Sequence, residues 1–572
     1  MAWLSEDELR VGLGCMRLST DEDRDEAGAV ETIEAAADAG ITVFDTARSY
    51  GDNERLLAHA LGSCGSAPSS RIVTKGGMSR PGGAWVPDGR ARSIRADCEA
   101  SLDALDGLAI DLYLLHAPDP RTPWRTSVRA LAKLLEEGLV ARVGVANVNR
   151  HQLDEALQLA PIAAVQVGLS AYDDRALRGG VLDRCLEAGL VLIAHSPLGG
   201  PRRAKRLDRL RPLADVSAAT AKSPQEIALA WLLHLAPNVV AIPGARRPET
   251  ASSSARAGSI RLGKHERNLL RSELGGLRAP KTTGRRDASA DVVVVMGVPG
   301  AGKTRLAEEY SARGYVRLNR DERGGPLREL AGELENLLAS GTRRVVLDNT
   351  YLTRASRSYV VESAARHGVP ARCTWLDTPL AQAQVNLVER LLDRFGELPT
   401  PERLKAVARG EAGILAPTRQ MRAFRELEPP SADEGFVEVE HIAFARTADP
   451  ERSRTGVFVA AAAMGHASWE ELLSGTDHAS PHLVFDWMPG GSATDLDVLG
   501  SKLAARVTGP VDVAACPHPG GPPVCWCRPP LPGLPLAFAR AHRIDTARSI
   551  VVGSSPAHRT LANTLGARYA EI

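Results

Sequence analysis

Short apolar runs recur along the first 275 residues at a nearly regular spacing, and helical patterns separate them. We count eight such runs, each of a length suited to a buried strand: V-G-L-G-C-M, I-T-V-F-D-T-A, R-I-V-T-K-G, D-L-Y-L-L-H-A, A-R-V-G-V-A-N, A-A-V-Q-V-G-L, L-V-L-I-A-H-S and V-V-A-I-P-G. Eight βα repeats in about 250 residues predict a closed (β/α)8 TIM barrel of the α/β class. In that fold the C-terminal strand ends face the active site, and here they carry Asp45, Lys75, His116, Asn147, Gln166 and Ser196.

A different pattern begins at residue 291, where four consecutive valines predict a strand buried on both faces of a parallel sheet. The run G-V-P-G-A-G-K-T then fills the positions of a phosphate-binding loop, and a helical pattern follows at 305–310. The residues predicted to bind ATP there are Gly297, Gly300, Gly302, Lys303 and Thr304, with the Thr304 hydroxyl on Mg²⁺ and Lys303 on the β- and γ-phosphates. An ordinary glycine turn is the alternative, and the combination of strand, loop and helix disfavours it.

The length of 572 residues exceeds one ordinary core, and two polar, non-periodic stretches at 276–290 and 446–455 are typical of linkers. They predict three domains: 1–275, 288–445 and 456–572. The formal charge of +1 provides no global attraction to nucleic acid or to a membrane. No apolar run approaches about 20 residues and the start lacks a basic and apolar leader, so we expect a soluble, cytoplasmic protein.

The first domain resembles the aldo-keto reductases through G-L-G-C-M-R-L-S, D-T-A-R-S-Y-G, V-T-K-G, L-L-H-A-P-D, V-G-V-A-N, H-S-P-L-G and I-P-G-A-R-R. The resemblance implies a catalytic tetrad of Asp45, Tyr50, Lys75 and His116 and the cofactor NADPH. It also implies that Asn147 and Gln166 hold the nicotinamide carboxamide and that Ser196, Pro197, Leu198 and Gly199 wrap the pyrophosphate. Arg246 and Arg247 suit the 2′-phosphate, with a solvated surface as the alternative. Ala146 and Ser252–Ser254 depart from the family pattern.

Carbonyl reduction needs these residue types, because a carbonyl that accepts hydride develops charge on its oxygen. Tyr50 would donate the proton, and the Lys75 ammonium, held by Asp45, would bring the phenol pKa closer to neutrality. His116 would orient the carbonyl oxygen and stabilise its developing charge. The expected substrate is a small-molecule aldehyde or ketone.

The second domain resembles the polynucleotide 5′-kinases through R-L-N-R-D-E-R and V-V-L-D-N-T. On that resemblance Asp321 is the catalytic base, and Asp348 and Thr350 organise the acceptor side or the metal. Arg390 and Arg394 share a helix face and suit a lid over the phosphates, with a salt-bridged surface as an equal alternative. The acceptor is then either a nucleic acid 5′-OH end or a small-molecule hydroxyl.

The third domain carries C-P-H-P-G-G-P-P-V-C-W-C, which places Cys516, His518, Cys525 and Cys527 in an array suited to structural Zn²⁺. Disulfides are the alternative, disfavoured without secretion. This loop and I-V-V-G-S-S-P-A-H resemble the zinc-loop branch of haloacid-dehalogenase-type phosphatases. The expected catalytic carboxylates are absent: alanines occupy 460–463, and Pro529, Ser554 and His558 stand at other catalytic positions. Asp486 lacks a partner, so we expect a small α/β pseudo-phosphatase domain.

Together these features predict a reductase fused to an ATP-dependent kinase. Two alternatives remain: an end-healing kinase whose barrel senses redox state, or an assembly protein in which the last domain docks a partner.

Overall fold

The computed structural model describes residues 3–572 apart from 6–7, 275–289, 321–326, 409–410, 412, 447–448 and 474. The predicted base Asp321 and most of the linker predicted at 276–290 lie outside the described residues. The chain divides into two compact units, Met1–Arg278 and Ala279–Ile572. Within the described residues, no helix combines the length and the apolar character needed to cross a bilayer.

The first unit is a parallel barrel, as predicted. Its strands are hydrogen-bonded in the order β1 (Leu13–Gly14), β2 (Val43–Asp45), β3 (Arg71–Gly76), β6 (Ile110–Leu115), β7 (Val143–Ala146), β8 (Ile162–Gly168), β9 (Val191–His195) and β10 (Val239–Ile242). The ring is joined where Gly12 N donates to Ala241 O at 2.8 Å and Gly14 N donates to Pro243 O at 2.9 Å. A short antiparallel hairpin of β4 (Met78–Ser79) and β5 (Val86–Pro87) follows β3.

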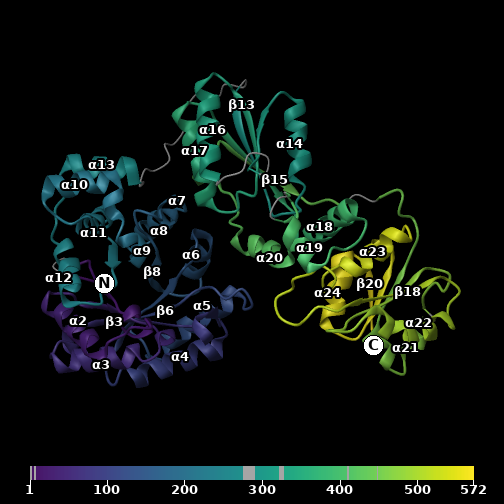
Figure 1. The fold of residues 1–572 in the computed structure, drawn as a ribbon, viewed down its shortest axis with the longest axis horizontal. Coiled ribbons are helices and arrows are strands. Elements are labelled where there is room, and N and C mark those ends of the chain that lie inside the picture. The colour runs from purple at the N-terminus through teal and green to yellow at the C-terminus, as the bar shows by residue number, and fades with distance from the viewer. Residues whose placement is uncertain are drawn as a thin grey trace. The chain divides into compact units, whose positions relative to one another are not determined.

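Helices surround the barrel (Figure 1). The main ones are α2 (Glu26–Asp38), α3 (Asn53–Ser63), α4 (Ala91–Ala104), α5 (Trp124–Glu136), α6 (Arg150–Leu157), α8 (Val181–Glu187), α10 (Arg211–Thr220), α11 (Pro224–Leu235), α12 (Pro248–Ala257) and α13 (Lys264–Leu274). Their apolar faces and the outer strand faces form one buried cluster, and inward-facing side chains such as Val43, Leu114 and Ile193 form a second. A barrel filled by its own side chains leaves only its rim for chemistry.

The second unit begins with a five-stranded parallel sheet of order β12 (Val316–Leu318), β13 (Arg344–Asp348), β11 (Asp291–Met296), β14 (Ala371–Asp377) and β15 (Glu438–Ala443). The valines of the central strand β11 are buried on both faces, in separate apolar clusters. The helices of this part are α14 (Lys303–Ala312), α16 (Leu327–Ala339), α17 (Arg354–Arg366), α18 (Leu380–Phe395), α19 (Pro401–Val407) and α20 (Pro417–Glu426).

A second five-stranded parallel sheet completes this unit, in the order β18 (Val511–Cys516), β17 (His482–Trp487), β16 (Val457–Ala460), β19 (Ile550–Gly553) and β20 (Arg568–Glu571). Its helices are α21 (Trp469–Leu473), α22 (Asp497–Ala504), α23 (Gly533–Ala541) and α24 (Pro556–Leu565). The chain is therefore a TIM barrel followed by two further parallel α/β sheets.

Candidate active site

A buried ion pair lies at the barrel rim. Asp45 ends β2 and Lys75 lies on the adjacent strand β3, so the barrel itself brings them together. The Lys75 Nζ lies 2.6 Å from Asp45 Oδ1 and donates a second bond of 2.8 Å to the Thr46 carbonyl. Gln166 Nε2 donates to the other Asp45 oxygen at 2.6 Å. Both charges are thus buried with their hydrogen bonds satisfied, the condition under which a buried pair is tolerated.

Tyr50 lies against this pair. Its ring centroid is 5.3 Å from Lys75 Nζ, and the residue is 7% exposed. Burial raises the pKa of Tyr50 by more than Lys75 lowers it, so the net shift is upward from the usual value. Burial alone would lower the pKa of Lys75, but Asp45 and Tyr50 outweigh it and raise that pKa. Lys75 lowers the pKa of Tyr50, which is the predicted direction. The net shift of the Tyr50 pKa is nevertheless upward, opposite to the prediction, because burial excludes water from the site. A phenol that stays protonated is suited to donate a proton.

His116 follows β6 and faces the same phenol. The two ring centroids are 5.8 Å apart with an interplanar angle of 79°, and Ser49 Oγ lies 3.4 Å from His116 Nδ1. Burial, helped by Lys75, lowers the pKa of His116 to about 3. The imidazole is therefore neutral near pH 7 and offers a hydrogen bond without bringing a charge. The structure thus brings all four residues of the predicted tetrad together.

The two residues predicted to bind the nicotinamide contact the tetrad in this structure. The Gln166 amide is engaged by Asp45, as above, and Asn147 Nδ2 donates to the His116 carbonyl at 2.9 Å. Asn147 Oδ1 lies 3.0 Å from His195 Nε2, and Asn147 has a φ of +57°. A carboxamide ligand would share these amides with the tetrad.

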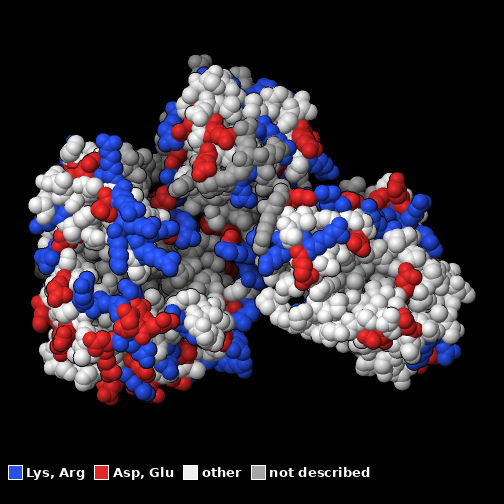
Figure 2. Space-filling model, in the orientation of Figure 1, with Lys and Arg blue, Asp and Glu red and all other residues white. Residues whose placement is uncertain are grey.

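The predicted pyrophosphate loop, which comprises Ser196, Pro197, Leu198 and Gly199, forms a tight turn after β9. Gly199 N donates to Ser196 O at 2.8 Å, and a Cβ on Gly199 would lie 2.6 Å from the Tyr172 ring, so only glycine fits this turn. Cations follow directly on α9 (Pro201–Ala204) and the next turn, in the region where Figure 2 shows Lys and Arg gathered on this unit. The exposed ones are Arg202, Arg203, Lys205, Arg206 and Arg209. Their field favours a phosphate-bearing ligand beside the loop.

The two arginines predicted for the 2′-phosphate follow β10. Arg246 Nη1 lies 3.0 Å from Asp23 and 3.3 Å from Asp21, whereas Arg247 directly precedes α12. Spacing along the sequence provides no sign of the Arg246 contacts, because the acids lie more than 200 positions earlier. An incoming phosphate would have to compete with two carboxylates for Arg246.

The sequence analysis did not identify Trp85, which lies on the β4–β5 hairpin. Its ring centroid is 6.1 Å from that of Tyr50 and 5.6 Å from that of His116, and the Arg80 guanidinium stacks over it at 4.6 Å. Trp85 is 45% exposed, an unusual setting for a large aromatic side chain. The lone tryptophan in G-G-A-W-V-P was the available signal.

The phosphate-binding loop leads into α14 as predicted. Gly302 precedes the helix with a φ of +95°, Lys303 begins the helix, and Thr304 lies in its first turn. Lys303 Nζ donates to the carbonyls of Gly297 and Val298 at 3.0 Å each. The ammonium is thus held over the loop that it would serve.

Asp348 ends β13 beside this loop and is 3% exposed. Its Oδ2 accepts from Arg317 Nη2 at 2.5 Å and from Asn319 Nδ2 at 3.0 Å. Gly297 N donates to the Thr350 carbonyl at 3.4 Å, which links the loop to the turn after β13. These positions place Asp348 and Thr350 beside the phosphate loop, and their predicted role in organising the acceptor side or the metal stays a prediction.

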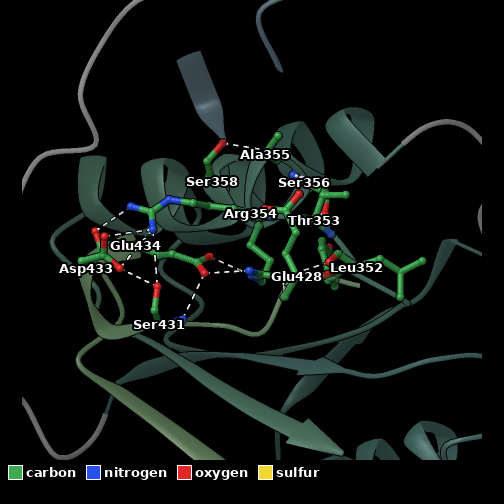
Figure 3. Close-up of polar contacts among 12 residues, drawn as sticks. Leu352, Thr353, Arg354, Ala355, Ser356, Ser358, Glu428, Ser431, Asp433 and Glu434 are labelled. Carbon is green, nitrogen blue, oxygen red and sulfur yellow. Dashed lines mark hydrogen bonds and ion pairs between the residues drawn. The ribbon is translucent and has the colours of Figure 1, made fainter. Parts of the chain in front are cut away.

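A polar cluster fixes the far side of that turn (Figure 3). Arg357, on α17, is fully buried; it makes a bidentate pair with Glu434 at 2.6 and 2.7 Å and donates to the carbonyls of Tyr351, Leu352 and Glu428. The Arg354 backbone N–H donates to Glu428 Oε2 at 3.4 Å. Burial raises the pKa of Glu428 to about 7. The cluster joins 350–352 to 428–434, a connection that spans about 80 positions of sequence.

The two predicted lid arginines do not contact the loop. Arg394 makes a bidentate pair with Glu411 at 2.8 and 3.0 Å, and Arg390 Nη1 lies 3.5 Å from the Gly413 carbonyl. These contacts favour the salt-bridged surface that the sequence left as the alternative. The same helix reaches the loop through Asn386, whose Nδ2 donates to Gly300 O at 2.8 Å and which sequence reasoning missed.

The four predicted zinc ligands converge, and their ligand atoms all lie within 4.8 Å of one another. The Cys516 sulfur lies 3.7 Å from that of Cys525 and 3.3 Å from that of Cys527, and His518 Nδ1 lies 3.3 Å from Cys527 Sγ. A tetrahedral zinc with Zn–S bonds of about 2.3 Å requires sulfurs about 3.8 Å apart, so the donor set fits this metal. Cys516 ends β18, the other three ligands belong to the loop that follows, and the three cysteines are free thiols.

In the described part of the last sheet, the carboxyl ends of the neighbouring strands β16 and β17 carry a single carboxylate, that of Asp486. Ala460 ends β16, and Asp486 on β17 accepts from Ala462 N at 2.9 Å and from Trp487 N at 2.8 Å. The Ser554 backbone N–H donates to His558 Nδ1 at 3.3 Å. Backbone donors therefore already engage the Asp486 carboxylate.

Known proteins resemble separate parts of the chain. Residues 10–272 match the aldo/keto reductase family, and residues 292–409 match a family described as an AAA domain. The aldo-keto reductase str7 of Strobilurus tenacellus is 29% identical over 265 residues, 41% of this chain and 78% of that protein. An uncharacterized oxidoreductase of Schizosaccharomyces pombe is 31% identical over 262 residues, 44% of this chain and 82% of that protein.

Solved structures are also similar to part of the chain. The thermostable aldo-keto reductase Tm1743, crystallised with epalrestat, is 33% identical with a TM-score of 0.41, covering 46% of this chain and 95% of its own. An aldo-keto reductase from Klebsiella pneumoniae in complex with NADPH is 27% identical with a TM-score of 0.41, covering 47% and 92%.

Proposed function

Because this chain belongs to the aldo/keto reductase family through residues 10–272, we propose that its barrel reduces an aldehyde or ketone with NADPH. The observation that carries the proposal is the buried Lys75–Asp45 pair beside Tyr50 and His116. A cluster of two charges, a phenol and an imidazole at a barrel rim is suited to proton transfer.

The bound nicotinamide would supply a hydride to the carbonyl carbon. Tyr50 donates its phenolic proton to the carbonyl oxygen as the C–H bond forms, and the product is an alcohol. Lys75 stabilises the phenolate that remains, and Asp45 holds Lys75 in place. The neutral His116 ring donates a hydrogen bond to the same oxygen while charge develops on it.

The test is NADPH oxidation with a panel of aldehydes and ketones. Tyr50→Phe should lower kcat by about 10²- to 10⁴-fold with unchanged NADPH affinity, because only the proton donor is removed. Tyr569→Phe in the last sheet is the matched control. Wild-type turnover retained by Tyr50→Phe would refute the proposal, and NADPH binding without turnover on any substrate would favour the redox-sensor alternative.

Preference for NADPH over NADH is proposed to rest on Arg246 and Arg247, supported by the cations that follow the 196–199 loop. Arg247→Ala should weaken NADPH binding but leave NADH binding nearly unchanged. Equal loss for both cofactors would assign the arginine to another role.

The second proposed activity is transfer of the ATP γ-phosphate, with Mg²⁺, to a hydroxyl acceptor. Its support is the AAA-domain match together with Lys303 and Asp348 at the phosphate loop. Thr304 would hold the metal, and Asp321 is proposed as the base. Incubation with labelled ATP and either 5′-OH oligonucleotides or small polyols distinguishes the acceptor classes, with Lys303→Ala as the inactive control.

The last sheet is proposed to be a pseudo-phosphatase domain stabilised by structural zinc on Cys516, His518, Cys525 and Cys527. Metal analysis of the purified protein should find one zinc per chain, lost in Cys527→Ser. Phosphatase turnover that Asp486→Ala abolishes would contradict the non-catalytic assignment.

A further inference from the structure

The apolar face of helix α18 is buried by the C-terminal domain, residues 456–572, which contains the last sheet. Leu387, Val388, Leu391 and Leu392 belong to the same buried cluster as the strands and helices of the last sheet, among them Phe458. The helix packs against both α23 and α24. A shared core of this kind differs from the polar interfaces usual between domains that move independently.

Ion pairs reinforce this contact. Arg452 makes a bidentate pair with Glu389 of α18 at 2.6 and 2.7 Å, and Arg540 pairs with Asp393 one turn further on. Bidentate guanidinium–carboxylate geometry fixes orientation as well as distance. The rotation of α18 about its own axis is thus set by Arg540 of the C-terminal domain and by Arg452 of the segment that precedes this domain.

The cysteine cluster contacts the segments on either side of α19. Leu398, which follows α18, packs against Cys516, Cys525 and Cys527. Trp526, between two of these cysteines, is 2% exposed, and its Nε1 donates to the Leu415 carbonyl at 3.0 Å. Leu415 lies two residues before α20, so one loop of the last domain contacts the segment that leads out of α18 and the segment that leads into α20.

Those two helices contact the phosphate loop. Besides the Asn386 bond to Gly300, the Gly300 Cα approaches α18 so closely that a Cβ would lie 2.4 Å from the Ala383 carbonyl. Gln420 of α20 donates from Nε2 to the Pro299 carbonyl at 3.0 Å. Backbone position in such a loop decides where its N–H groups point, and these groups bind the phosphates.

We infer that the C-terminal domain is a positioning module for the nucleotide site: the Cys516–Cys527 loop holds α18 and α20, and these helices hold residues 299–300. The inference rests on the proposed zinc and nucleotide binding. It accounts for a phosphatase-like domain without catalytic carboxylates, since the domain contributes packing rather than chemistry.

The test uses the full-length chain and a fluorescent ATP analogue with Mg²⁺. Trp526→Phe keeps an aromatic ring but removes the indole N–H that donates to Leu415, so the dissociation constant should rise about three- to tenfold while zinc content stays at one per chain. Trp469→Phe is the control, because Trp469 is the buried first residue of α21 in the same apolar cluster and the substitution removes the same indole atoms; it should leave binding unchanged.

Chelation of zinc should weaken nucleotide binding at least as much, and added zinc should restore it. NADPH binding to the barrel should not change in any sample. Hydrogen exchange without nucleotide gives a separate readout: amides of 297–302 and 380–395 should exchange faster in Trp526→Phe than in Trp469→Phe.

Wild-type nucleotide affinity and wild-type exchange in Trp526→Phe would overturn the inference while leaving the proposed nucleotide site intact. A wild-type protein that binds no nucleotide would overturn both, and unchanged zinc content and NADPH binding would then locate the failure in the phosphate-loop proposal.

Discussion

Each unit of this protein contains an ion pair that is almost completely buried. The side chains of Lys75 and Asp45 are 1% and 5% exposed, and those of Arg357 and Glu434 are 0% and 3% exposed. The N–O distance is 2.6 Å in both. Burial and distance therefore do not distinguish them.

The neighbours of the two pairs differ. Lys75 lies against the Tyr50 phenol, and this contact raises the pKa of Lys75. Arg357 donates to backbone carbonyls and lies near the Glu428 carboxylate, whose pKa it lowers against the larger effect of burial. The first pair adjoins a phenol and an imidazole at the barrel rim, where a proton can pass to a substrate. The second pair joins two segments of the chain through backbone carbonyls, and its titratable neighbour Glu428 accepts from the Arg354 backbone N–H. A buried ion pair therefore indicates chemistry when a proton donor adjoins it at the rim of a barrel, and architecture when it mainly bonds the backbone.

Removal of the Lys75 ammonium should have the largest effect. Lys75→Met should lower kcat for carbonyl reduction by about 10²- to 10⁴-fold, because the phenolate left by Tyr50 loses its counter-charge. Steady-state NADPH oxidation measures this loss. The double variant Lys75→Met with Asp45→Asn controls for the unpaired carboxylate. If kcat of Lys75→Met stays within about threefold of wild type, the buried pair at the barrel rim is not catalytic.

Removal of the Arg357 guanidinium should affect stability alone. Arg357→Met leaves the Glu434 carboxylate buried and unpaired, which should cost the second unit about 3–5 kcal/mol of unfolding free energy. Calorimetry of the full chain should show the second-unit transition shifted down, with barrel turnover unchanged. Arg422→Met, in an exposed pair with Glu426, should cost no more than about 1 kcal/mol.

The stability of the second unit should depend on Glu428. Its folded pKa of about 7 lies above the usual 4.5, so the folded state binds this proton more tightly, and stability falls as pH rises through that window. The loss should reach about 3 kcal/mol between pH 4.5 and 8. Glu428→Gln should remove this pH-dependent loss of stability when unfolding is measured across the same range. If the variant and the wild type show the same pH profile, Arg357 neutralises the Glu428 carboxylate.

His116 should give the opposite slope in the barrel. Its folded pKa of about 3 lies below the usual 6.5, so the unfolded state binds the proton more tightly and stability falls as pH decreases from 6.5. The loss should be about 2 kcal/mol by pH 5. His116→Gln should flatten the profile of the barrel transition, and a fall retained by this variant would assign the proton to another group.

The apolar periodicity determined most of the fold. It predicted the barrel, and it placed Asp45, Lys75 and His116 at strand ends that a parallel barrel brings to one rim. The four valines of β11 predicted a buried strand, and the glycine spacing after them predicted a phosphate loop. Both predictions succeeded because each pattern lies within a few consecutive residues and reflects the local backbone conformation.

Tertiary structure alone decided three other features. The net pKa shift of Tyr50 depends on how much water the folded rim excludes, which no spacing encodes. The partners of Arg246, Arg394 and Arg357 lie 223, 17 and 77 positions away, so they meet only after the chain has folded. The burial of α18 by the last domain likewise depends on two separately patterned segments sharing one core. Local pattern specifies which face of an element is apolar, but packing decides what covers that face.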